Sequence, residues 1–379
     1  MDVSLQKTVG FLVFIGIGLL LKVKFRQKEE TTGIKKIILN LALPATIFIA
    51  LLSVELKKEL FLLPFLALIL NLLLFFIFPF LLPLCGIKKD TSEYRTASLL
   101  IPSLAPGLSA FPFILEYLGD GALAKAAMAD LGNKVFVLII LYIVAMNWFY
   151  KVHGASSSLH ISKIRDLLKV LIAEPVNLFI IAALILLGFG YHLENLPVVF
   201  SETLKRLSLL MTPLVLLFIG LAVSIKKGQF QKIFSMLMLR AGVVILISTL
   251  FISLGNISFG TDRLIVLAFS LSACSFWPFA HIAAIGLREQ QEGRKFKTFS
   301  NTLAINILAL SFPMSIILIL GMFSFGNTIT KLPVLVIISV SLIFFGITPG
   351  LFQKWRYSNK KNLVEKKYRP DFKNANAEA

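Results

Sequence analysis

The feature that most constrains this chain is the apolar stretch at residues 98–118, which is long enough to cross a lipid bilayer but contains several prolines. Pro102, Pro106 and Pro112 each lack a backbone N–H and clash with the carbonyl group one turn earlier, so a continuous helix cannot form there. A broken backbone at membrane depth is tolerated only where it is buried in protein or lines a watery cavity. We interpret this stretch as one half of a solute site, and residues 264–287 as the other half.

Apolar runs recur along the whole chain. Of its 379 residues, 57% are hydrophobic and only 15% are charged, whereas soluble domains carry about 25% charged residues. Many runs approach the ~20 residues that a helix needs to span the hydrocarbon core. We therefore expect an all-α polytopic membrane protein with eleven spans, at residues 8–23, 34–54, 59–85, 94–118, 122–149, 170–192, 202–224, 230–254, 263–287, 298–324 and 333–353.

Basic residues dominate one set of the loops between these runs. Of the 38 lysines and arginines, 28 fall on one side of the expected membrane and 8 on the other. Because cytoplasmic loops carry the excess of basic residues, we expect an integral protein of the plasma (inner) membrane with its N-terminus outside and its C-terminus in the cytoplasm. This distribution also accounts for the net charge of +18, so no nucleic-acid partner is expected.

The two halves of the chain share glycine and proline positions. Because each half has five spans, an odd number, the second half would be an inverted repeat of the first. The expected organisation is a repeat at 1–149, a cytoplasmic linker at 150–169, a second repeat at 170–324, an extra helix at 333–353 and a basic cytoplasmic tail at 354–379. The matches, at separations of 172, 169 and 166 residues, are Gly16 with Gly188, Pro44 with Pro213 and Pro112 with Pro278.

Interrupted helices at corresponding positions mark the substrate site in inverted-repeat transporters, and here they are the fourth and ninth helices. Their broken ends leave free N–H groups and a positive dipole end, which suit an anionic solute. The alternative is that the prolines only kink packed helices. The candidate substrate-binding residues are Ser103, Pro106, Gly107, Ser109, Pro112, Ser275, Pro278, His281 and Asn301.

Several of these candidates have a second interpretation. The serines either bind the solute or merely permit close helix packing. His281, one turn after Pro278, either faces the solute or packs against a neighbouring carbonyl group. Asn301 and the adjacent Ser300 begin the tenth helix, where they either line the cytoplasmic path or cap the helix.

Ionisable residues inside spans cost about 2.5–3.5 kcal/mol each and are therefore functional candidates. Asp130 and Lys134 lie one turn apart on the fifth helix, in the order that favours an ion pair. They form either a proton or ion relay or, with Asn133, a neutralised pair that locks this helix against the crossing. Arg240 either binds a carboxylate through its guanidinium fork or reaches towards the cytoplasmic face. Glu174 is expected near the end of a span.

A family resemblance rests on the segments Asn40–Phe48, Pro106–Pro112, Asp130–Asn133, Pro213–Gly220, Arg240, Trp277–Ala280 and Ser300–Pro313. Together they resemble the auxin efflux carrier family of membrane transporters, over roughly residues 8–324. This resemblance implies two inverted five-helix repeats, with the fourth and ninth helices crossing and a scaffold-like and a transport-like unit moving past each other. The folds of bile acid–sodium symporters and sodium–proton antiporters look similar.

The chain departs from that family's fourth-helix pattern, Asn-x-Gly-x-x-Gly-x-Pro. Aligned on Pro112, it has Ala105, Gly107 and Ala110 instead, so auxin itself is not the expected substrate. The eleventh span also lies outside the family's ten helices.

We therefore expect a secondary transporter, or permease, for a small organic anion that works by alternating access. The sequence contains no His-Glu-x-x-His, no Gly-x-Ser-x-Gly and no phosphate loop of the Gly-x-x-x-x-Gly-Lys-Ser/Thr type. Neither an enzyme nor a cofactor is therefore expected, and coupling to H⁺ or Na⁺ is left open. The alternative is a membrane-embedded sensor or scaffold that uses the eleventh helix and the basic tail, or a channel. The expected partners are the solute and the lipid bilayer, with a homodimer left open.

Overall fold

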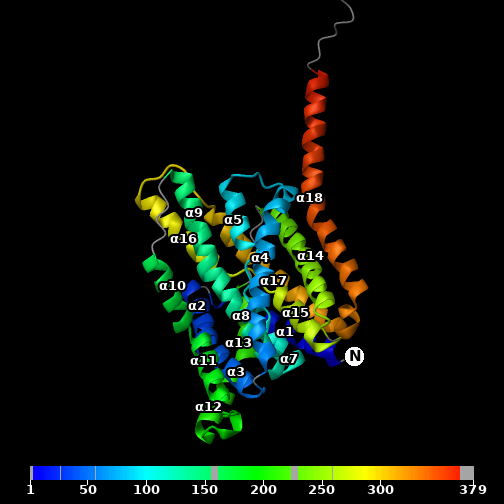
Figure 1. The fold of residues 1–379 in the computed structure, drawn as a ribbon. Helices are drawn as coiled ribbons and strands as arrows, with labels where there is room; N and C mark the ends of the chain where they lie inside the picture. The colour runs from blue at the N-terminus through cyan, green and yellow to red at the C-terminus, as the bar shows by residue number, and fades with distance from the viewer. Residues whose placement is uncertain are drawn as a thin grey trace, which may run out of the picture.

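The computed structural model describes residues 3–25, 27–55, 57–154, 161–222, 229–257 and 259–367, and every regular element within these ranges is a helix (Figure 1). Within these described ranges, eight helices are long and apolar enough to cross a membrane, or nine when one bent pair counts as a single span. A polytopic membrane protein is thus supported. The expected count of eleven spans stays a prediction, because the two proline- or serine-rich segments consist of helices shorter than a span.

The first half of the chain holds four long helical segments and one interrupted segment. The long second and fifth segments each contain a π-helical turn, at Ile38–Ala42 and Phe136–Ile140. The helices are α1 (Val3–Leu21), α2 (Lys28–Ile37), α3 (Leu43–Leu52), α4 (Lys58–Leu81), α5 (Ser92–Leu100), α6 (Pro106–Ser109), α7 (Phe111–Leu118), α8 (Asp120–Val135) and α9 (Leu141–His153).

The second half begins with a pair of helices bent by 65° at Glu174. The helices are α10 (Ile161–Ala173), α11 (Pro175–Gly188), α12 (Val198–Leu209), α13 (Met211–Ala222), α14 (Phe230–Leu254), α15 (Thr261–Ser270), α16 (Phe276–Gln291), α17 (Asn301–Phe325) and α18 (Leu332–Lys367).

Two segments differ from the expected boundaries. Residues 161–169, which we expected to belong to a polar linker, form the start of α10, and residues 155–160 of that linker lie outside the described part. The backbone of α18 continues from the expected extra helix into the expected tail as far as residue 367, and residues 368–379 lie outside the described part.

The helices pack into two groups. In the first bundle, α1 packs along α13, and α3 packs along α11 and α12. In the second bundle, α4 packs along α8 and α14 packs along α18, with α5, α9, α15, α16 and α17 between them. The bundles also contact each other, chiefly where α3 meets α8, and the two units that the family resemblance implies stay a prediction.

Glycines allow the closest contacts inside the second bundle. A Cβ atom on Gly132 of α8 would overlap the carbonyl oxygen of Pro64 in α4, so only glycine lets these backbones touch. Gly242 and Gly346 have the same role between α14 and α18, where the Ser339 hydroxyl also donates to the carbonyl oxygen of Gly242 at 2.9 Å.

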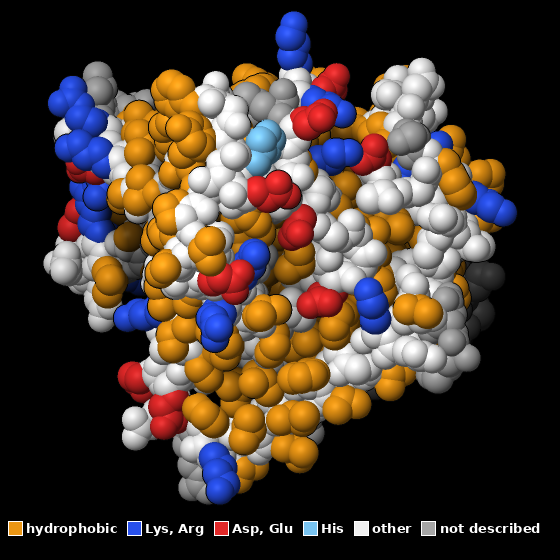
Figure 2. Space-filling model, turned by 90° about the horizontal axis from the view of Figure 1, so that it is seen from below, with side chains coloured by type: hydrophobic (Ala, Val, Ile, Leu, Met, Phe, Trp, Pro, Cys, Tyr) orange, Lys and Arg blue, Asp and Glu red, His pale blue; other side chains and the backbone are white. Residues whose placement is uncertain are grey.

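The N-terminus and the far end of α18 lie at opposite ends of the molecule (Figure 1). Figure 2 views the lower end, where hydrophobic side chains cover broad areas and charged side chains lie between them. Many large apolar side chains on the flanks are exposed, among them Phe65, Phe76 and Phe344, as is typical of a surface that faces lipid.

Candidate functional site

Two interruptions of helical structure meet inside the second bundle. The first separates α5 from α6 at residues 101–105, and the second separates α15 from α16 at residues 271–275. The amide N–H of Ser275 donates to the Ser103 hydroxyl and that of Ala273 donates to the Ser109 hydroxyl, both at 2.9 Å. We call residues 101–109 and 271–275 the crossing.

Prolines account for the first interruption only. Pro102 lies within it, and Pro106 is the first residue of α6, a position where a proline fits because the N–H has no helical acceptor. The second interruption contains no proline. Pro278, which we expected to mark it, is the third residue of α16, where its missing N–H is again of no consequence. The ninth-helix break therefore lies upstream of the position predicted from the sequence.

Arg240 reaches the crossing from the middle of α14. Its Nε donates to the carbonyl oxygen of Ile101 at 2.8 Å, and its Nη2 donates to those of Ser103 at 3.1 Å and Ser272 at 2.8 Å. The residue is only 3% exposed. The guanidinium group is therefore held inside the crossing rather than extending along α14, whose nearer end lies about 15 Å from Arg240. The position of Arg240 near the middle of a long apolar run was the feature of the sequence that indicated a buried role.

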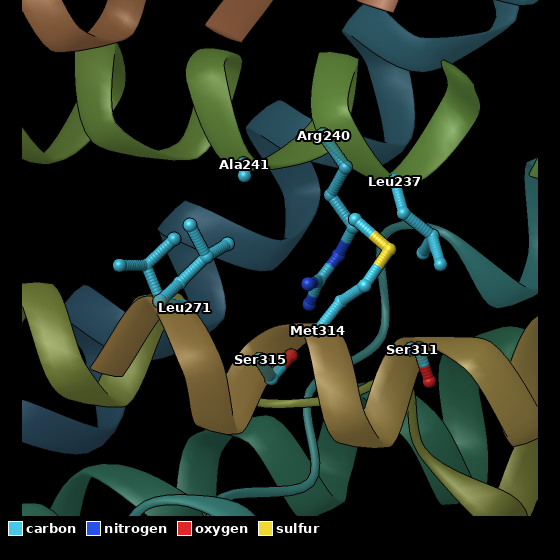
Figure 3. Close-up of a pocket in the computed structure, with 8 residues that line it drawn as sticks. Leu237, Arg240, Ala241, Leu271, Ser311, Met314 and Ser315 are labelled. Atoms are coloured by element: carbon cyan, nitrogen blue, oxygen red, sulfur yellow. The ribbon is translucent and has the colours of Figure 1, made fainter. Parts of the chain in front are cut away.

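A small cavity lies beside this guanidinium group. Figure 3 shows Arg240 extending from α14 towards α17, with Ser311 and Ser315 on the facing helix. The cavity volume is about 10 Å³, which is room for roughly one water molecule. A carboxylate solute does not fit there in this conformation. The lining residues are Leu237, Arg240, Ala241, Leu271, Ser311, Met314, Ser315 and Leu318.

Asn133 connects the crossing to α8. Its Nδ2 donates to the carbonyl oxygen of Leu104 at 3.0 Å and to Oδ1 of Asp130 at 2.8 Å. Its Oδ1 accepts from Asn71 of α4 at 3.1 Å. The contact with Leu104 fixes the fifth helix against the first interruption, as one of the two sequence interpretations proposes.

Lys134 continues this chain of contacts into the first bundle. Its Nζ lies 3.7 Å from Oδ2 of Asp130 on its own helix and 3.1 Å from Oε2 of Glu174 at the α10–α11 bend. It also donates to Oδ1 of Asn177 at 2.8 Å. Glu174, expected near a span end, directly precedes α11 and is also an ion-pair partner, with a side chain only 25% exposed. We call Asn133, Asp130, Lys134 and Glu174 the polar chain.

Sequence reasoning missed Asn177. It is nearly fully buried and holds the bend by donating to the carbonyl oxygen of Leu171 at 2.5 Å. The sequence could have indicated it, because Asn177 is the one amide side chain of the apolar helix α11. It lies one turn after Glu174, near the proline that begins the helix.

Two predicted residues lie apart from the crossing. His281 is buried in α16, with Nε2 3.0 Å from the carbonyl oxygen of Val137 and its ring against Tyr142, so it packs against a carbonyl group as the second interpretation proposes. Asn301 lies against Gly286, ten residues into α16 and therefore about 15 Å along it. The capping residue of α17 is Ser300, whose hydroxyl accepts from the Leu303 N–H.

Gly107 places the crossing next to the first bundle. A Cβ atom on this residue would lie 3.3 Å from Cδ2 of Leu43 in α3. Pro112, the second residue of α7, is buried in the same region, and the ring of Phe113 packs on Phe11 of α1 at 5.8 Å between centroids. The crossing thus borders the interface between the two bundles.

A second buried polar cluster connects α5, α9 and α16 to the segment that precedes α17, at one end of the second bundle. His153 Nε2 lies 3.1 Å from Oε1 of Glu289, which also accepts from the Thr298 N–H at 2.7 Å. Arg95 donates from Nε to the carbonyl oxygen of Thr298 at 2.8 Å. These contacts close this end of the bundle.

No family model matches this chain. Over 226 residues, which are 58% of the chain and 68% of its relative, it is 28% identical to an uncharacterized transporter of Methanocaldococcus jannaschii. This similarity and the helices of membrane-spanning length indicate a membrane transporter, and a transporter relative agrees with the expectation that the chain is not an enzyme.

Proposed function

We propose that this chain is a secondary transporter of the auxin efflux carrier type that carries a small organic anion by alternating access at the crossing. The observation that carries the proposal is the pair of interrupted helices that bond to each other through Ser103 and Ser109 inside the second bundle. Irregular backbone at membrane depth is expensive unless it lines a path or a site, and interrupted helices are where transporters of this kind bind their substrates.

An anion suits the side of the crossing that borders the first bundle. α7 and the 16-residue α16 both begin there, and the N-terminal end of a helix carries a partial positive charge. Gly107 presents no side chain towards Leu43, so a modest separation of the bundles would open room for a carboxylate. In the described conformation the Ser103 and Ser109 hydroxyls accept hydrogen bonds from the amide groups that a solute would otherwise contact.

The polar chain supplies the coupling in this proposal. Lys134 lies between two carboxylates, Asp130 in its own bundle and Glu174 in the other. Sliding of one bundle past the other lengthens one ion pair before the other. Protonation of a carboxylate releases Lys134 from it, so proton binding and bundle movement are linked.

Uptake into proteoliposomes tests the proposal. Purified protein is assayed with a panel of labelled mono- and dicarboxylates, with and without an imposed pH gradient. We expect saturable uptake of at least one carboxylate, countertransport on its addition to the opposite side, and stimulation by the gradient. Flux that does not saturate identifies a channel, and a panel without any flux favours the sensor or scaffold.

The Asp130→Asn variant tests the polar chain directly. The amide keeps the size of the side chain and can still bond to Asn133, but it cannot change charge. We expect loss of uptake with normal amounts of folded protein. Glu202→Gln is the matched control, since Glu202 pairs with Lys205 at 3.0 Å on the surface, and we expect it to transport normally. Unchanged transport by Asp130→Asn would remove Asp130 from the coupling role.

A further inference from the structure

Arg240 is a buried cation that faces two helix ends. The carbonyl groups that it contacts follow α5, a helix of nine residues, and α15, a helix of ten residues. The C-terminal end of a helix carries a partial negative charge, and here two such ends converge on one guanidinium group. Within the described residues, no carboxylate forms an ion pair with Arg240, whereas lysine and arginine side chains form eight ion pairs elsewhere. Peptide carbonyl groups are therefore its counter-charge.

We propose that the guanidinium group of Arg240 is a built-in cation of the crossing, held where interrupted helices otherwise coordinate an alkali ion. Unwound carbonyl groups and the C-terminal ends of half-helices are the usual ligands of Na⁺ in transporters with broken helices. In this chain three such oxygens, of Ile101, Ser103 and Ser272, accept hydrogen bonds at 2.8–3.1 Å from Arg240.

The geometry leaves no place for a second cation beside Arg240. The adjoining cavity has room for about one water molecule, and the fixed positive charge repels another ion at that distance. The hydroxyl groups that line the cavity, those of Ser311 and Ser315, are neutral. In the part of the chain that the structure describes, no cluster of three or more acidic, histidine or cysteine side chains is placed to hold a metal ion.

Arginine suits this position better than lysine does. Its planar group donates in fixed directions and stays charged at any physiological pH, so one residue can bridge both interruptions at once. Arg240 is thus a positioning residue that keeps the carbonyl groups of α5 and α15 aligned without an external ion. Only one consequence rests on the proposed function, namely that Na⁺ bound at the crossing does not drive transport.

The first experiment measures the thermal unfolding midpoint of the purified wild-type protein in detergent, in NaCl, KCl and choline chloride at equal ionic strength. We expect the same midpoint in all three salts. A midpoint several degrees higher in NaCl alone, saturating with concentration, would overturn the inference, because it would reveal a Na⁺ site.

The second experiment removes the built-in cation. We expect Arg240→Ala to lower the midpoint by several degrees, and millimolar guanidinium chloride, far below denaturing concentrations, to restore part of the loss. Arg263→Ala is the matched control, because Arg263 also donates to two carbonyl oxygens, those of Ile257 and Thr330, but nearer the surface. It should lose stability without responding to guanidinium. Equal responses of both variants, or none by Arg240→Ala, would contradict the proposal.

A charge series keeps the test decisive where the alanine variant does not fold. Arg240→Lys retains a cation that reaches fewer oxygens, and Arg240→Met retains the length without the charge. We expect folded yield and the thermal unfolding midpoint to fall in the order wild type, Arg240→Lys, Arg240→Met. Equal behaviour of lysine and methionine would show that packing alone matters. None of these measurements needs a solute, so failure of the transport proposal and failure of this inference are distinguishable.

Discussion

The two interruptions at the crossing share Arg240 as a donor to their carbonyl groups but differ in how their amide groups are satisfied. In the first, at residues 101–105, Pro102 and the following Pro106 have no N–H to donate, and carbonyl oxygens accept from side chains of other helices. Donors come to them from neighbouring helices, namely Arg240 of α14 and Asn133 of α8.

The second interruption, at residues 271–275, has no proline and keeps its amide groups. The N–H groups of Ala273, Cys274 and Ser275 all donate to serine hydroxyls from other elements. The amino-acid composition of a break thus determines which partners its backbone needs. The carbonyl groups of the proline-rich break need cationic or amide donors. The proline-free break retains amide groups, which also need neutral acceptors. Removing an amide or cationic donor should therefore lower the free energy of unfolding more than removing a hydroxyl acceptor does.

The largest effect among the following variants is expected for Asn133→Leu, at the proline-rich break. The change leaves the carbonyl oxygen of Leu104 without its donor and Asn71 without its acceptor. Because each buried polar group that loses its partner costs about 1–3 kcal/mol, we expect a loss of about 3 kcal/mol in the free energy of unfolding. SDS titration in mixed micelles measures it. Asn71→Leu, which breaks only one of these contacts, should lose less.

A smaller effect is expected for Ser103→Ala, which removes a neutral acceptor. The Ser275 N–H then has no partner, so we expect a loss of about 1–2 kcal/mol, measured in the same titration. A loss as large as that of Asn133→Leu would show that the two breaks do not differ in the way described.

Ser311→Ala should cost less still. Its hydroxyl accepts from the Cys274 N–H at 3.3 Å, a long bond compared with the usual 2.9–3.0 Å. We expect a loss of about 0.5–1 kcal/mol, measured beside Ser103→Ala so that bond length is the main difference between them.

Ser272→Ala should have no cost. The Ser272 hydroxyl is buried and has no hydrogen-bond partner in the described structure, while the backbone carbonyl group of the same residue accepts from Arg240. Removing an unpartnered buried hydroxyl is neutral or stabilising, so the free energy of unfolding should change by less than about 0.5 kcal/mol. A clear loss would reveal a partner that the hydroxyl finds in another conformation.

The sequence predicted the first interruption well and the second poorly, and the reason is chemical. Proline excludes a continuous helix whatever surrounds it, so Pro102 and Pro106 were sufficient. The second break depends on serine hydroxyls and on Arg240, which come from distant parts of the chain, and Pro278 only follows it.

The roles of polar side chains were predictable only where both partners lie on one helix. Asp130 and Lys134 are one turn apart, and their pairing was expected. The contact between Lys134 and Glu174 joins residues 40 positions apart across a bend, and no periodicity in the sequence indicates it. Asn301 was predicted from its neighbours in sequence, yet it lies against Gly286, about 15 Å along α16 from the second interruption.

The seating of α18 on α14 has a mechanical consequence. The backbones of the two helices touch at Gly242 and Gly346, and hydroxyl groups of Ser235 and Ser339 bond across the contact. Such close packing resists sliding of one helix along the other, so we expect α18 to move together with α14. The distance between a fluorescent label on α18 and one on α12 would therefore report displacement of one bundle against the other.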